Sequence, residues 1–418
     1  GYIGVDIFFV ISGYLITSHL RDALNSNRFN FSGFYAKRIR RIIPASIFVL
    51  VCTIVLSCVL LPPLILPQVL KESIATALYV PNVYHALQQT DYLADTSVSP
   101  FLHYWSLGVE EQFYLLWPLI LFLLLKVLKL NKNILIPVIL IILLASFLGN
   151  YFLTKHSQSW SFFLIFTRAW ELIAGGLLAL YTTGRNFHPK AQSKIVGFVC
   201  GWSGIVLLGY CAVIYNEATE FPGAAAALPV LGAILVIFAG TVSNATALNK
   251  ILANRLLQYL GTISYSLYLW HWPVIIFAEE LFPDLNTTTS LILLFAVSVC
   301  LADITYRFVE QPFRFKAPNV PAKSVLTYSL SASMMITVII GGYGYQLKSQ
   351  PLYIDKTSQT LAPTTHPDFT GFVPSNLTPA LRQAKNSFPG IYGDGCHDDF
   401  FTTNARGCSY GETQSNKT

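Results

Sequence analysis

Three ionisable side chains lie beside an apolar run in the stretch FLHYWSLGVEEQFYLLWPLI, residues 101–120: His103, Glu110 and Glu111. His103 precedes Glu110 by seven residues, so the two share one face if the segment is a helix. Tyr114 follows Glu110 at i+4 and places an aromatic ring beside it. Burial disfavours a charged carboxylate, which suits proton transfer near neutral pH. His103 and Glu110 are therefore candidate catalytic residues; alternatively, they are hydrated groups in an interfacial aromatic belt.

Another candidate lies in LGTISYSLYLWHWPVIIF, residues 260–277. His271 stands between Trp270 and Trp272, and the Pro273 that follows removes a backbone hydrogen bond from a helix. Ionisable groups in an apolar span are costly, which makes His271 a third candidate catalytic residue. The alternative is a histidine that only satisfies a hydrogen bond inside a helical bundle.

Basic side chains are clustered in FYAKRIRRIIPAS, residues 34–46. Guanidinium groups bind phosphate through paired hydrogen bonds, and a helix that starts at Pro44 would add the positive end of its dipole. The cluster therefore predicts a site for an anionic substrate or cofactor at Arg38, Arg40 and Arg41. It is also typical of the basic residues that flank a membrane span on its cytoplasmic side.

Ionisable residues also occur within two other apolar segments. In TRAWELIAGGLLAL, Arg168 and Glu171 have the i, i+3 spacing of an ion pair. Asp6 lies in the first apolar segment. All three are candidates for function, or alternatively for a structural pair that fixes helix register. The small residues 12–13 and 175–176 predict close helix packing.

The elements that must position these side chains are apolar helices. The chain has 418 residues, of which 53% are hydrophobic and only 11% charged, whereas soluble domains carry about 25% charged residues. The apolar residues come in runs of roughly 20, enough for a helix to cross about 30 Å of hydrocarbon. The sequence therefore predicts an all-α polytopic membrane protein, a helical bundle of about ten spans. The predicted spans are 4–20, 42–61, 112–128, 134–153, 162–181, 195–215, 224–241, 256–277, 288–308 and 325–345.

Lys and Arg are concentrated in alternate connections between these spans, as expected for cytoplasmic loops. The alternation requires that residues 62–111 form one outer loop, partly re-entrant, rather than a further span. Gly1 and the tail from Lys348 are then expected outside the cytoplasm. The basic connections are 21–41, 126–132, 185–194, 250–255 and 307–323.

Residues 1–346 are predicted to form the membrane domain, and residues 347–418 an extracytoplasmic segment. The first part of that segment is rich in Pro, Thr and Asn, which is typical of a linker. Its last part is predicted to begin a soluble domain. Cys396 and Cys408 lie there and are expected to pair as a disulfide in an oxidising compartment.

Other chemistries lack support in the sequence. It contains no Walker-type or Rossmann glycine loop, no paired CxxC or HExxH spacing, and no GxSxG elbow. We therefore expect no metal, no bound cofactor and no nucleic-acid partner.

Taken together, the motifs resemble the membrane-bound acyltransferase-3 family, especially bacterial acetyltransferases that modify O-antigen or peptidoglycan. The resemblance covers residues 1–315. It implies ten core helices and an eleventh that leads to an extracytoplasmic SGNH-type domain. On this basis we expect the sequence to be a piece of a longer protein, truncated at the first helix and within the SGNH-type domain. The matching segments, in family order, are GVDIFFVISGYLI, FYAKRIRRIIPA, LHYWSLGVEEQFYLLWP, RAWELIAGGLLA, GTISYSLYLWHWPV and EQPFR.

The resemblance implies transfer of an acetyl group from cytoplasmic acetyl-CoA across the membrane to a hydroxyl of a cell-envelope glycan, either O-antigen lipopolysaccharide or peptidoglycan. By motif, it assigns Arg38 and Arg41 to acyl-CoA handling. It assigns His103 and Glu110 to the outer side of the path, and His271 to its lining. The expected partners are membrane lipids, acetyl-CoA as donor substrate and a cell-surface polysaccharide acceptor. The expected location is the bacterial inner membrane, with the tail on its outer side.

Two other functions fit the same residues. A transporter without acyl chemistry would place buried ionisable groups along its substrate path. A structural anchor for an outer esterase would need none of them for chemistry. Arginine-dependent binding of acetyl-CoA distinguishes the enzyme from the transporter, and loss of glycan acetylation in a Glu110→Gln variant distinguishes it from the anchor.

Overall fold

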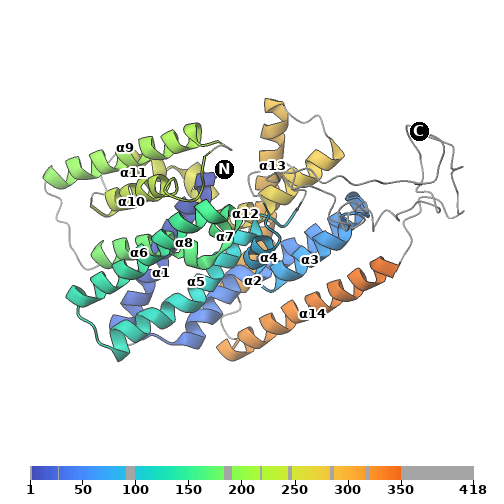
Figure 1. Ribbon diagram of the computed structural model, residues 1–418, viewed down its shortest axis with the longest axis horizontal. Coiled ribbons are helices and arrows are strands. Elements are labelled where there is room, and N and C mark those ends of the chain that lie inside the picture. Colours follow the sequence, from blue (N-terminus) through green and yellow to red (C-terminus); the bar gives the residue numbers. More distant parts are fainter. Residues whose placement is uncertain are drawn as a thin grey trace, which may run out of the picture. The chain divides into compact units, whose positions relative to one another are not determined.

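In the computed structural model the chain splits into two units, residues 1–345 and 346–418. Every regular element among the described residues is a helix (Figure 1). Cys396 and Cys408 lie outside the described residues, as does the predicted extracytoplasmic segment beyond residue 349. The structure describes residues 2–26, 28–90, 99–182, 191–216, 219–242, 247–282, 287–316 and 320–349.

One long helix corresponds to each of the ten predicted spans. By length and composition, eight helical segments of the described chain can cross a membrane; α10 is a shorter apolar helix, and α12 is not among the eight. The prediction of an all-α polytopic membrane protein is confirmed, whereas the number of crossing helices stays a prediction. The long helices are α1 (Tyr2–Asn25), α2 (Phe31–Leu60), α5 (Tyr104–Phe122), α6 (Lys132–His156), α8 (Ile165–Thr182), α9 (Ala191–Ile214), α10 (Ala227–Val242), α12 (Arg255–Leu281), α13 (Thr288–Thr305) and α14 (Ala322–Ser349).

Two of these helices begin earlier than hydropathy predicts. The side chain of Asn30 accepts a hydrogen bond from the backbone N–H of Ser32 at 3.2 Å and caps α2 there. Pro44 therefore lies inside α2, and the predicted helix start at Pro44 is wrong. α5 begins at Tyr104, ahead of the predicted span 112–128, so that Glu110 lies within the helix.

The segment between α2 and α5 contains two short helices, α3 (Leu66–Ala77) and α4 (Pro81–Leu87). Twelve residues of α3 are too few to cross the roughly 30 Å of a bilayer core. Both helices nevertheless pack among the long ones. This packing is evident from polar side chains such as Glu72, Asn82 and His85, which are almost fully buried. The other short elements are α7 (Gln158–Phe163), α11 (Ala247–Leu252) and the π-helical turns η1 (Leu123–Val127), η2 (Tyr306–Glu310) and η3 (Pro312–Lys316).

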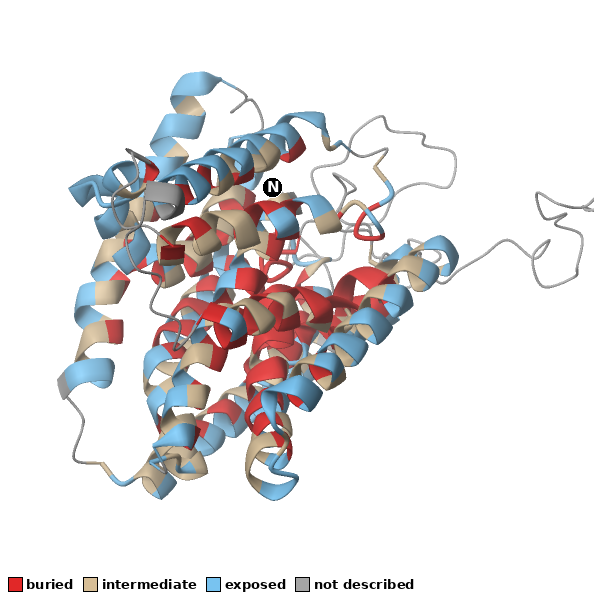
Figure 2. Cartoon of the chain, turned by 90° about the vertical axis from the view of Figure 1, so that its left-hand side faces the viewer, coloured by how far each residue is buried: buried red, intermediate tan, exposed pale blue. Residues whose placement is uncertain are grey.

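Burial separates central from peripheral helices. In Figure 2, buried residues gather on the helix sides that face the middle of the bundle, and exposed residues cover its outside. In the membrane-length stretch that includes α7 and α8, 78% is buried inside the protein, whereas in the corresponding stretch of α14 only 11% is buried. Large apolar side chains such as Val213 and Phe308 are exposed at the periphery, as expected for surfaces that face lipid.

The backbones of helices α1 and α8 lie in direct contact with each other. A Cβ atom on Gly13 would overlap the carbonyl oxygen of Leu172, and one on Gly175 would overlap the carbonyl oxygen of Val10. These contacts are backbone to backbone, so no side-chain movement relieves them. The predicted packing notch at residues 175–176 is confirmed.

We expect Gly175→Val to destabilise the protein by about 1–3 kcal/mol or more, because the added side chain has no space and α1 must move away. The measurement is thermal unfolding in detergent followed by tryptophan fluorescence. Gly341→Val on α14 is the matched control, since nothing lies within 4 Å of a Cβ atom there. Equal melting temperatures for the two variants would contradict the packing described here.

Candidate active site

Glu110 is almost fully buried at the meeting point of three helices. Its Oε1 atom accepts a hydrogen bond from the Ser12 hydroxyl of α1 at 2.6 Å, and another from the Tyr114 hydroxyl one turn along α5. The Arg38 Nη2 atom of α2 lies 3.9 Å from the same oxygen. The carboxyl group is thus removed from water and held in one orientation.

Arg38 lies between two carboxyl groups and an aromatic ring. Its Cζ atom is 3.7 Å from the centre of the Tyr114 ring, and its Nη2 atom is 3.6 Å from Glu111 Oε1. Sequence reasoning placed Arg38 at an anion site and gave Glu111 no role of its own. The pair of adjacent glutamates could have indicated a separate role for Glu111, since neighbouring positions on a helix contact different partners.

The other two arginines of the cluster have different surroundings. Arg40 donates a hydrogen bond to the carbonyl oxygen of Val320, just before α14. Arg41 is exposed on α2 and interacts electrostatically with Glu111 and Glu310. Arg38 and Arg41 are therefore the members of the cluster that lie near the Glu110 and Glu111 carboxyl groups.

His103 and His271 lie next to each other, with ring centres 5.6 Å apart. His103 is the N-cap residue of α5, and His271 is in the middle of α12. The Nδ1 atom of His271 is 2.7 Å from the carbonyl oxygen of Tyr268, which can only accept. A neutral His271 therefore carries its hydrogen on Nδ1 and leaves Nε2 as an acceptor.

Tyr268 connects the helices around this histidine pair. Its hydroxyl donates to the carbonyl oxygen of His103 and lies 2.9 Å from the Ser106 hydroxyl. Both ring nitrogens of His103 are buried without a hydrogen bond of normal geometry, although the Leu269 backbone interacts with the ring. Buried polar groups without a hydrogen-bond partner are uncommon and call for an explanation, of which a catalytic role is one. Sequence reasoning missed Tyr268, although YSLYLWHW places it three residues before His271.

The structure does not join His103 to Glu110. Their positions differ by about 10 Å along α5, and their contacts are with different neighbours: α12 for His103, and α1 and α2 for Glu110. Two tyrosine hydroxyls, from α12 and α5, bond to carbonyl oxygens on the turns of α2 that follow Arg38. Tyr265 donates to the carbonyl oxygen of Ile42 at 2.8 Å, and Tyr104 to that of Ser46 at 3.2 Å. Polar groups thus follow the interface of α2, α5 and α12 from Arg38 to the histidines.

A buried polar contact also attaches the segment between α2 and α5 to α12. Trp272 donates from Nε1 to the carbonyl oxygen of Ser99 at 2.8 Å, and the Ser99 hydroxyl donates to Glu72. Burial raises the pKa of Glu72, and the hydrogen bonds from Ser99 and Gln68 only partly oppose that effect. On α4, burial lowers the pKa of His85 to about 4, so that this side chain is neutral at pH 7.

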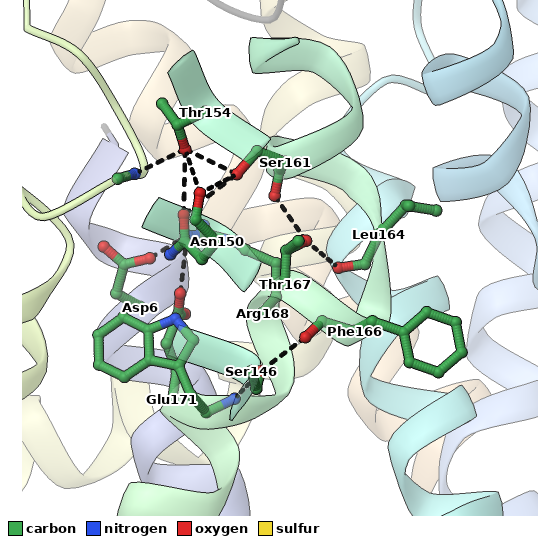
Figure 3. A network of polar contacts seen from close by, with 12 residues as sticks. Asp6, Ser146, Asn150, Thr154, Ser161, Leu164, Phe166, Thr167, Arg168 and Glu171 are labelled. Atoms are coloured by element: carbon green, nitrogen blue, oxygen red, sulfur yellow. Dashed lines mark hydrogen bonds and ion pairs between the residues drawn. The ribbon is translucent and has the colours of Figure 1, made fainter. Parts of the chain in front are cut away.

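Arg168, Glu171 and Asp6 form a separate, fully buried cluster (Figure 3). The Arg168 guanidinium is 2.7 Å from Glu171 Oε1 and 3.0 Å from Asp6 Oδ1. The predicted ion pair within α8 is confirmed, and Asp6 of α1 is a further partner that the spacing could not reveal. Hydroxyl and amide groups of α6 and α7, including Asn150 and Ser161, form the network drawn beside it. Four aromatic rings surround the guanidinium: Phe9, Trp105, Phe162 and Phe221.

Comparison with known proteins assigns this arrangement to a family. The model of the acyltransferase domain known as acyltransferase 3 matches residues 1–307. The chain belongs to the acyltransferase-3 family. All of the described side chains around Glu110 fall within the part that this family covers, as do His103 and His271. Across the described residues, no three His, Cys, Asp or Glu side chains group as a metal site.

Curated relatives of this acyltransferase-3 chain are bacterial O-acetyltransferases. The O-acetyltransferase OatA of Staphylococcus aureus (strain NCTC 8325) is 32% identical over 322 residues, which are 76% of this chain and 53% of OatA. The peptidoglycan O-acetyltransferase OatA of Listeria monocytogenes is 33% identical over 327 residues, 75% of this chain and 51% of that protein. The chain spans about half the length of the curated relatives it matches. No solved structure matches it.

Proposed function

We propose that the chain is the membrane part of an O-acetyltransferase that moves an acetyl group from cytoplasmic acetyl-CoA to a cell-envelope glycan. Peptidoglycan is the acceptor that the Listeria relative's name favours, and O-antigen lipopolysaccharide is the other acceptor class. The observation that carries the proposal is the buried Glu110 carboxylate, fixed by two hydroxyl groups beside Arg38. Lipid-facing structure alone has no need of such a group, which is costly inside a membrane.

In this reaction the acyl C–S bond of the thioester breaks and an ester C–O bond forms. The acceptor hydroxyl loses its proton, and the CoA thiolate gains one. We assign the first proton to Glu110, acting as general base, and the phosphates of acetyl-CoA to Arg38 and Arg41. Glu110 lies beside Arg38, so we place it with the donor and not on the outer side that the motif resemblance implies. We assign His103 and His271 to the lining of the path. These steps describe direct transfer; a route through an acylated side chain forms and then breaks one additional acyl bond, with the same net change.

The proposal includes an orientation. The N-terminal end of α2, with its basic side chains, faces the cytoplasm of a bacterial cell, as Lys and Arg near span ends usually do. Residues 1–346 then form the domain in the plasma membrane. Residues 347–418 lead out of it as an extracytoplasmic linker and the beginning of an SGNH-type domain.

Binding of CoA to the protein in lipid nanodiscs tests the proposal by isothermal titration calorimetry. We expect the double variant Arg38→Ala, Arg41→Ala to bind CoA at least about tenfold more weakly, since a hydrogen bond to a charged group contributes about 1.5–3 kcal/mol. Arg307→Ala is the matched control. Arg307 is an exposed arginine that pairs with Asp303 and has no contact with the Glu110 site.

The transporter alternative predicts a different result. A carrier that uses the same buried charges for another solute shows no CoA binding that depends on Arg38 and Arg41. Equal CoA affinities for the wild type, the double variant and the Arg307→Ala control would therefore remove the acyltransferase mechanism proposed here.

A further inference from the structure

The face of the Arg38 guanidinium group is in close contact with an aromatic ring, whereas its N–H edge has no carboxylate at hydrogen-bonding distance. The Cζ atom stacks 3.7 Å from the Tyr114 ring centre, which is close for a cation over an aromatic ring. The nearest carboxylate oxygens, on Glu111 and Glu110, lie 3.6 and 3.9 Å from Nη2. Both separations exceed hydrogen-bonding distance. Arg38 thus has two carboxylates nearby as charges and neither as a hydrogen-bond partner.

The same contact contains unused hydrogen-bonding capacity. The Nε atom of Arg38 and the Oε1 atom of Glu111 are buried and lack a hydrogen-bond partner. A buried donor without a partner costs free energy, which a suitable ligand recovers on binding. A phosphate group supplies two oxygens in the geometry of the guanidinium fork. The two glutamates, placed one residue apart on α5, do not.

We propose that an anionic donor displaces Glu110 and Glu111 from Arg38, so that Glu110 becomes a base without a neighbouring cation only when the donor is bound. The inference rests on the proposed function, in which Arg38 binds a phosphate of the donor. The Tyr114 ring stays in contact with the face of the guanidinium while the group turns its edge away from the carboxylates and toward the donor. Glu110 keeps its orientation during the exchange, because the hydrogen bonds from Ser12 and Tyr114 do not involve the arginine.

The surrounding charges allow the exchange. Among the described residues, Arg38 is the cation within ion-pair distance of both Glu110 and Glu111. When Arg38 turns to the donor, both carboxylates therefore lose their neighbouring cation. In this arrangement Glu111 is a positioning residue, which competes with the donor for Arg38.

The test is the affinity for CoA of a Glu111→Gln variant in lipid nanodiscs, measured by calorimetry. Removing a competing carboxylate should tighten CoA binding about two- to fivefold, the effect of a partly exposed ion pair. Glu111→Asp, which keeps the charge but withdraws it from Arg38, should give a smaller gain in the same direction. Glu280→Gln is the matched control, because it removes the same charge from an exposed position on α12.

A double-mutant cycle with Arg38→Ala identifies the route of the effect. The gain from Glu111→Gln should vanish in the Arg38→Ala background. A gain that persists there, or that Glu280→Gln reproduces, would show a general charge effect and overturn the exchange. Unchanged or weaker CoA binding by Glu111→Gln, with binding still lost in Arg38→Ala, would overturn the exchange alone. Absence of CoA binding by the wild type would overturn the exchange together with the proposed function.

Discussion

Replacing Glu110 with glutamine is expected to lower the rate of glycan acetylation by about two to four orders of magnitude, the usual contribution of a general base. Glutamine has the same shape, and its carbonyl oxygen still accepts the hydrogen bonds from Ser12 and Tyr114. The variant thus loses the ability to take up a proton while the surrounding packing is kept. The measurement is the acetyl content of purified cell-envelope glycan from cells that express each variant.

The control for this experiment must change a carboxyl group of the same helix bundle without touching the site. Glu279→Gln does so, because Glu279 is exposed near the end of α12. It should leave acetylation at the level of the wild type. If the Glu110→Gln protein is present at normal levels and acetylates normally, Glu110 is not the base, and the structural anchor becomes the better description of this domain.

Replacing Arg168 with methionine is expected to destabilise the protein by about 3–5 kcal/mol, because two carboxyl groups then remain buried without a cation. Asp6 and Glu171 are both fully buried, and the guanidinium is the cation that contacts them. Since Asp6 belongs to α1, losing its contact with the guanidinium also weakens the attachment of α1 to α8. The measurement is unfolding by a denaturing detergent, followed by tryptophan fluorescence.

Neutralising the two acids tests the reason for this loss. A triple variant with Arg168→Met, Asp6→Asn and Glu171→Gln should recover most of the stability, because no uncompensated charge remains. Arg307→Met is the single-site control. Arg307 is exposed and pairs with Asp303, which is itself partly exposed, so we expect a loss of no more than about 1 kcal/mol. A triple variant as unstable as Arg168→Met would show that packing of the guanidinium, and not its charge, is what matters.

Features that depend on neighbouring residues in the sequence were predictable. Hydropathy located ten helices, because a lipid-facing helix must be apolar along its length, and the i, i+3 spacing revealed the pair of Arg168 and Glu171. The start of α2 was missed because hydropathy does not register the polar cap that Asn30 provides. Hydropathy also gave no sign that Glu72 would be buried, since a short helix of moderate polarity resembles a surface loop.

Contacts between distant segments could not be predicted. The pairing of Asp6 with Arg168 joins α1 to α8, and that of His103 with His271 joins α5 to α12. Residue spacing carries no information on which helices become neighbours. For the same reason the sequence suggested that His103 and Glu110 act together, whereas the structure gives each its own partners. The predicted disulfide and the extracytoplasmic segment stay predictions, because they lie outside the described residues.

The glycine contacts between α1 and α8 bear on how the protein can move. With backbone pressed against backbone at Gly13 and Gly175, and with Asp6 bound to Arg168, these two helices cannot slide or tilt relative to each other without large cost. They must behave as one stiff body. Relative movement is easier where α2, α5 and α12 meet, because the contacts there are apolar side chains and tyrosine hydroxyls that can separate and reform.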